Sequence, residues 1–69
     1  MTGISQYSRQ LYSVTTRAYN EAVARGDTGA ARRLAGANLL RAQAYDRADG
    51  GYTLEVQRWA ARAGDAVAA

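Results

Sequence analysis

Nearly half of the apolar residues in this 69-residue chain are alanine, and this shortage of large side chains limits what the chain can fold into. Of its 33 apolar residues 16 are alanine and ten are large aliphatics, with five tyrosines and one tryptophan among the rest. Apolar burial stabilises a fold by about 25 cal/mol per Å², so a methyl group contributes far less than a leucine side chain. Ordering each residue costs roughly 1–2 kcal/mol. We therefore expect a thin core of marginal stability.

Small domains usually gain the missing stability from disulfides, a bound metal ion or a partner chain. The chain contains neither cysteine nor histidine, so it has no disulfide and lacks the usual ligands of a structural zinc site. We expect no metal and no cofactor. Association with another protein, or with a second copy of the chain, is the remaining route.

The helical spacing of apolar residues predicts an all-α fold. Proline is absent, and alanine is the best helix former. Apolar residues recur every three or four positions in three segments, at about 5–25, 28–48 and from Thr53 onward. We predict one small domain, 1–69, built as an antiparallel αα-hairpin plus a third, shorter helix. It forms either a small three-helix bundle or a helical oligomer.

The first segment carries one apolar stripe with polar residues opposite it. The stripe predicted to face the core is Ile4, Tyr7, Leu11, Val14, Ala18 and Ala22, and the opposite side is Gln6, Arg9, Gln10, Ser13, Arg17 and Asn20. Tyr12 and Tyr19 lie off this stripe.

Arg25-Gly26-Asp27 separates the first two segments. Glycine favours the left-handed conformation at helix ends, and aspartate is among the best residues for capping the next helix. The tripeptide also resembles the integrin-binding motif of secreted adhesion proteins, but no secretory signal or cysteine framework accompanies it. We interpret it as a helix break, whose short length makes the flanking helices antiparallel.

The second segment has a core face rich in small residues: Ala31, Leu34, Ala35, Asn38, Leu39, Ala42 and Tyr45. A buried asparagine commonly fixes the register between packed helices. We interpret Asn38 in this way, within the hairpin or between subunits; the alternative is a specific hydrogen bond to a partner chain. Leu40 lies off this face.

Asp49-Gly50-Gly51 forms the second break, and Thr53 is a plausible cap for the third helix. The predicted core face there is Val56, Trp59, Ala60, Ala63 and Val67, and Leu54 departs from it. Charged residues occupy another face as a solvated ladder of Glu55, Arg58, Arg62 and Asp65. The stretch 46–55 looks like a calcium loop but lacks the alternating oxygen ligands before the glycine. Helix capping and turn formation account for the same residues.

Histidine and cysteine are the usual groups that titrate or attack near neutral pH, and the chain has neither of them, nor a lysine that could act as base for a serine or threonine. We therefore expect a non-catalytic protein and name no catalytic residue. The first hypothesis for its function is a helical interaction or assembly module that self-associates or docks on a larger complex. The small size of the chain suggests a phage or accessory protein that binds a larger complex, including an inhibitor of such a complex. The candidate interface residues are Tyr12, Tyr19, Asn38, Leu40, Leu54 and Trp59.

The alternative hypothesis is nucleic-acid binding. All nine basic residues are arginine, and the net charge is +3. The candidate contacts to phosphate or to an acidic partner are Arg9, Arg32, Arg33, Arg41 and Arg47. The segment 51–59 also resembles the turn and recognition helix of helix-turn-helix proteins, although its spacing departs from that family's by one position.

The sequence also bounds where we expect the protein to act. It has no apolar run of membrane-spanning length and no secretory signal pattern. We expect it in the cytoplasm or in a virion, without a membrane partner.

Overall fold

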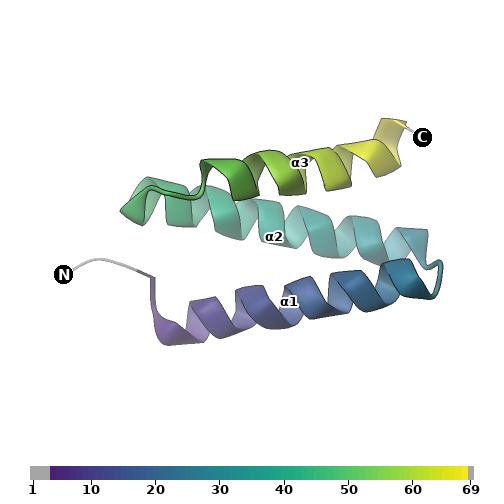
Figure 1. Cartoon of the computed structure of the whole chain (residues 1–69), viewed down its shortest axis with the longest axis horizontal. Coiled ribbons are helices and arrows are strands. Elements are labelled where there is room, and N and C mark those ends of the chain that lie inside the picture. Colours follow the sequence, from purple (N-terminus) through teal and green to yellow (C-terminus); the bar gives the residue numbers. More distant parts are fainter. Residues whose placement is uncertain (1–3, 69) are drawn as a thin grey trace.

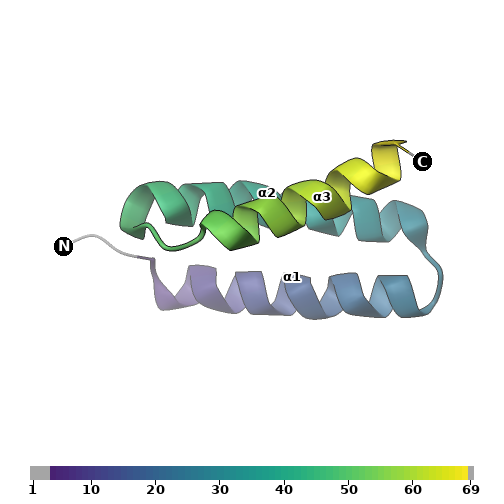
Figure 2. The same cartoon turned by 45° about the horizontal axis from the view of Figure 1, so that its top comes forward.

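The computed structural model describes the backbone of residues 4–68 and the side chains of residues 4–64. It confirms the all-α fold: the described chain forms α1 (Gln6–Ala24), α2 (Thr28–Asp49) and α3 (Thr53–Ala68). α2 lies between the other two helices and runs antiparallel to both (Figures 1 and 2). The backbones of α1 and α3 stay apart, and the molecule is long and thin, extending 41 × 22 × 13 Å along its principal axes.

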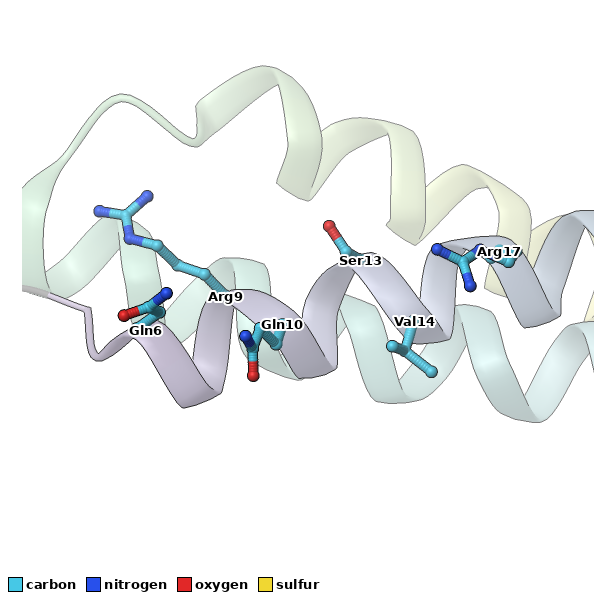
Figure 3. A pocket seen from close by; sticks show the side chains of 6 residues that line it. All are labelled: Gln6, Arg9, Gln10, Ser13, Val14 and Arg17. Carbon is cyan, nitrogen blue, oxygen red and sulfur yellow. The ribbon is translucent and has the colours of Figure 1, made fainter.

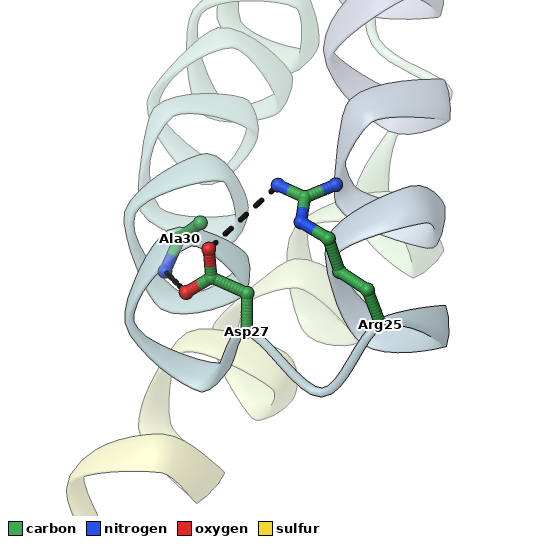
Figure 4. A network of polar contacts seen from close by, with 3 residues as sticks. All are labelled: Arg25, Asp27 and Ala30. Carbon is green, nitrogen blue, oxygen red and sulfur yellow. Dashed lines mark hydrogen bonds and ion pairs between the residues drawn. The ribbon is translucent and has the colours of Figure 1, made fainter.

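The Arg-Gly-Asp tripeptide is a helix break, as predicted. Gly26 has a φ of 76°, and its backbone N–H donates to the carbonyl of Val23 at 3.0 Å. The backbone N–H of Asp27 donates to the carbonyl of Ala22 at 2.8 Å, which completes a Schellman motif. The Asp27 carboxylate then caps α2 by accepting from the N–H of Ala30 at 3.1 Å (Figure 4). Arg25 lies 3.7 Å from the same carboxylate.

The side chain of Asp46 stabilises the turn at the second break. Gly50 ends α2 with a φ of 73°, and its N–H donates to the carbonyl of Asp46 at 2.8 Å. The Asp46 carboxylate accepts from the backbone N–H of Tyr52 at 2.9 Å. Thr53 is the first residue of α3 rather than its cap, because the carbonyl of Tyr52 already accepts from the N–H of Val56. The calcium-loop resemblance is thus explained by a turn.

The core is made of methyl groups and aromatic rings. Its buried apolar residues are Ala22, Ala31, Ala35, Ala42, Tyr45 and Trp59. All of the α2 members belong to the predicted core face of that helix, and Leu34 and Leu39 border them half-buried. Among the large aliphatic side chains in residues 4–64, none is fully buried. The prediction of a thin core is therefore confirmed.

The orientation of α1 differs from the prediction. Tyr7 and Val14, expected in the core, are 70% and 55% exposed, whereas Tyr12 and Tyr19 pack against the core. The helix is rotated because hydroxyl groups on its α2-facing side form hydrogen bonds with α2. Thr15 and Thr16 both accept such bonds, so the inward face includes Ala22 of the predicted stripe but excludes Tyr7 and Val14. The predicted polar side of α1 is exposed throughout.

α3 presents its predicted core face with one exception. Trp59 is buried and Val56 and Ala63 are half-buried against it, but Ala60 is exposed. Arg62, predicted on a solvated ladder, instead covers the rings of Trp59 and Tyr19. The side chains of Val67 and Asp65 lie outside the described residues.

Candidate interaction surface

Five aromatic side chains connect the three helices and form what we call the aromatic layer: Tyr12, Tyr19, Tyr45, Tyr52 and Trp59. Their rings meet edge to face, with centroids 5.2 Å apart for Tyr19 and Trp59 and 5.6 Å apart for Tyr12 and Tyr45. Such contacts are favourable beyond the area they bury. The layer spans the space between the backbones of α1 and α3. Its large rings therefore fill the interior that bulky aliphatic side chains fill in other cores.

Hydrogen bonds fix the rings of this layer. The indole Nε1–H of Trp59 donates to the Tyr12 hydroxyl at 2.7 Å, and the Tyr45 hydroxyl donates to the carbonyl of Ser8 at 2.7 Å. The guanidinium of Arg62 lies 4.7 Å from the Trp59 ring centroid and 5.2 Å from that of Tyr19. Trp59 is buried and Tyr12 and Tyr19 are half-buried, so these three candidate interface residues pack within the chain, and their role toward a partner stays a prediction.

Asn38 is at the centre of a polar network between α1 and α2. Its side chain is 0% exposed, and its Nδ2 donates to Thr16 Oγ1 at 2.9 Å and to the carbonyl of Tyr12 at 3.4 Å. Arg41 Nη1 donates to Asn38 Oδ1 and to Thr15 Oγ1, both at 3.1 Å. The structure thus places Asn38 within the hairpin, where these bonds require one alignment of the helices.

Burial raises the pKa of the Tyr12 hydroxyl above its ordinary value, because a buried phenolate loses its hydration. The hydrogen bond from Trp59 opposes this increase in the pKa, and the carboxylate of Glu55 adds to it. At neutral pH the Tyr12 hydroxyl is neutral, as in any tyrosine, and its oxygen accepts the indole N–H of Trp59.

The largest apolar exposure on α1 follows the stripe that was predicted to face the core. We call it the outer α1 stripe, and its residues are Tyr7, Leu11, Val14 and Ala18. Two of these side chains are more than half exposed, and the other two are partly exposed. The residues are spaced by four, three and four positions, which is the spacing of helices that pack against a partner helix. α1 therefore has one face toward the core and a second apolar face toward the outside.

A second exposed region lies on the side of α2 opposite its core face. We call it the outer α2 face, and its residues are Arg33, Gly36, Ala37, Leu40, Ala44 and Arg47. Leu40 is 67% exposed there, which agrees with its predicted position off the core face. Leu54, at the start of α3, is likewise 68% exposed. The roles of Leu40 and Leu54 in an interface stay predictions.

The five arginines proposed as nucleic-acid contacts do not form one surface. Arg9 belongs to a shallow depression along α1, which is lined by Gln6, Arg9, Gln10, Ser13, Val14 and Arg17 (Figure 3). Arg41 is engaged by Thr15 and Asn38, and Arg32 also makes an interaction within the chain. Arg33 and Arg47 are exposed on the outer α2 face.

The helix-turn-helix resemblance does not extend to the tertiary structure. α2 and α3 run side by side in opposite directions (Figures 1 and 2). Helix-turn-helix domains instead cross their helices at about 90–120°, which lets the second helix enter the major groove. Residues 51–59 here form a tight turn and the start of a packed helix, with Trp59 in the core.

Within the described residues, no group of histidine, cysteine and carboxylate side chains is arranged to hold a metal ion. The helices of that part of the chain are also too short or too polar to cross a membrane. Comparison of the chain with models of known protein families, with curated proteins and with solved structures finds no match.

Proposed function

We propose that this protein is a non-catalytic helical interaction module that self-associates through the outer α1 stripe. The observation that carries the proposal is the exposure of Tyr7 and Val14, at 70% and 55%, on one continuous stripe of a helix. Apolar side chains exposed in a row gain stability from burial against another helix. The thin core makes this gain important, because no large aliphatic side chain in residues 4–64 is fully buried within one chain.

The charges beside this stripe favour a second copy of the chain as the partner. Arg9 and Arg17 line the same depression as Val14, and Glu21 lies one turn beyond Arg17 on α1, so charges of both signs are present. Two copies related by a two-fold axis bring the same patch together, so a patch of one sign would repel itself. The outer α1 stripe is bordered by charges of both signs, so Glu21 of one copy can offset arginines of the other. Docking on a larger host assembly, as a phage or accessory protein does, stays a prediction.

The test compares two substitutions of one residue type on the same helix. Val14 lies in the outer α1 stripe and is 55% exposed, whereas Val23 lies off it and is 53% exposed. We expect light scattering behind size exclusion to give at least twice the 7.4 kDa monomer mass for the wild type and for Val23→Lys. Val14→Lys places a desolvated charge in the interface and is expected to give a monomer.

Circular dichroism of both variants establishes that they retain the helical fold. A wild-type protein that is monomeric at every concentration tested would refute self-association. An oligomer that survives Val14→Lys but not Val23→Lys would assign the interface to another face of α1.

A further inference from the structure

The outer α2 face has a charge pattern unlike that of the outer α1 stripe. Leu40 lies seven residues after Arg33 and seven before Arg47. The three residues therefore share one side of the helix over about 21 Å. Both arginines are exposed, and Leu40 between them is 67% exposed. The acidic residues of α2 are Asp46 and Asp49, and the helical period places both away from this side.

We propose that the outer α2 face binds an acidic amphipathic helix of another protein. The partner helix presents an apolar residue to Leu40 and carboxylates to Arg33 and Arg47. Arginine suits this role because its planar guanidinium pairs with both oxygens of a carboxylate. This proposal does not depend on self-association through α1.

A second copy of the chain does not fit this face. Two antiparallel copies centred on Leu40 would place Arg33 against the partner's Arg47, and two parallel copies would place each arginine against its own equivalent. Both arrangements bring like charges together in an interface. The complementary partner therefore carries negative charge at both ends of the contact.

The small residues around Leu40 favour a helix over a nucleic acid. Gly36 and Ala37 are partly exposed and Ala44 is exposed, and a Cβ placed on Gly36 would meet nothing within 4 Å. This open space lets a partner backbone come close, as small residues do where helices pack together. A phosphate backbone would leave Leu40 in water, and a single leucine between arginines is too narrow an apolar face for a membrane surface.

The probe for the test is a synthetic helical peptide. It carries leucine and alanine at the centre of one face, and glutamates on the same face one and two turns before and after this apolar centre. Its binding is followed by fluorescence anisotropy and mapped by backbone amide NMR shifts. A matched peptide with glutamine in place of each glutamate is the charge control. All titrations are repeated with the Val14→Lys variant, so that self-association and peptide binding are measured separately.

We expect the glutamate peptide to bind with amide shifts concentrated on the outer α2 face, and the glutamine peptide to bind at least tenfold more weakly. Leu40→Gln should weaken binding about tenfold because the apolar contact is lost. Arg33→Gln with Arg47→Gln should weaken it by a similar factor and reduce its salt dependence. Arg9→Gln with Arg17→Gln, which removes the same charge from α1, should leave the affinity within twofold.

Three results would overturn the proposal. The first is no binding of the glutamate peptide at millimolar concentration in low salt, and the second is an equal loss of affinity in the α1 control variant. The third is a DNA duplex that binds more tightly than the peptide and does not respond to Leu40→Gln, which would assign this face to nucleic acid.

Discussion

Asn38 shows how one buried polar side chain selects a single alignment of two helices that pack through small residues. Alanine methyl groups fit against each other in several registers, because they differ little in shape from one turn to the next. The hydrogen bonds of Asn38 to Thr16 and from Arg41 form in one register only, and a shifted hairpin would leave them unpaired in the interior. Specificity at this interface therefore comes from polar contacts.

Replacing Asn38 by alanine tests this role. We expect Asn38→Ala to lower the free energy of unfolding by about 1–3 kcal/mol, because the Arg41 guanidinium loses its acceptor in a partly buried site. Urea unfolding followed by circular dichroism measures the change. The control is Asn20→Ala on the exposed side of α1, which should be neutral or slightly stabilising because alanine has the higher helix propensity. Equal effects of the two variants would contradict the proposed network.

Tyr12 makes the stability of the fold depend on alkaline pH. Burial raises its folded pKa above the unfolded value of about 10. The stability due to the neutral hydroxyl is therefore fully present only well below the unfolded pKa, at about pH 9 and lower. It is lost as the pH rises from the unfolded pKa through the higher folded pKa, because the unfolded chain releases the proton first.

Tyr12→Phe separates this effect from that of the other tyrosines. We expect the variant to be less stable than the wild type at pH 8 by about 1 kcal/mol, because Trp59 Nε1–H loses its acceptor. The difference should shrink between pH 9 and pH 11, as measured by urea unfolding at each pH. A difference that stays constant across this range would show that the Tyr12 hydroxyl does not titrate differently on folding.

At the scale of the element, glycine has opposite effects at a helix end and in a helix interior. Gly26 ends α1 with a left-handed φ of 76°, whereas Gly36 lies within α2 and lacks a positive φ. A Cβ added at either position meets no atom within 4 Å, so backbone conformation alone decides the outcome. These two positions therefore form a matched pair.

We expect Gly26→Ala to destabilise the protein by about 1 kcal/mol, because an alanine is strained in the left-handed region. Gly36→Ala should stabilise it by about 0.5–1 kcal/mol, because alanine is the better helix former. Thermal unfolding of the two variants beside the wild type measures both changes. A Gly26→Ala protein as stable as the wild type would mean that the first break does not need this conformation.

α1 also illustrates how an element can carry more than one apolar face. Most of its apolar residues lie on about half of the helix circumference. Only the part of this arc that is next to Thr15 and Thr16 faces the core. The remaining part, the outer α1 stripe, is what a second helix can cover.

At the scale of the whole molecule, stability and association are linked. A chain whose large aliphatic side chains are half-buried or exposed throughout residues 4–64 gains burial when copies associate. If the associated form is folded, its stability rises with protein concentration by mass action.

We therefore expect the melting temperature of the wild type to increase over a hundredfold range of protein concentration. The melting temperature of Val14→Lys should not change over this range. Differential scanning calorimetry at several concentrations makes the measurement, with Val23→Lys as the control that retains the dependence. A wild-type melting temperature independent of concentration would contradict coupled folding and association.

Local chemistry was sufficient to predict much of this fold. Helix propensity and apolar spacing located the three helices, and the properties of Gly26 and Asp27 located the first turn. The core face of α2 was also predictable, because on that helix most core positions are small and apolar. The outward positions of Leu40 and Leu54 followed from the same spacing.

The sequence by itself determined that the protein is a set of three short helices with a methyl-rich core, since these properties depend on neighbours along the chain. Only the tertiary structure decided which side of α1 faces inward. That choice depends on hydrogen bonds from Asn38 and Arg41 to the threonines of α1, more than 20 residues away in sequence. The role of Arg62 over Trp59 and Tyr19 was likewise undetermined, because contacts between α1 and α3 have no local signal. Apolar periodicity measures how much surface a helix can bury, but the hydrogen bonds between helices determine which surface it does bury.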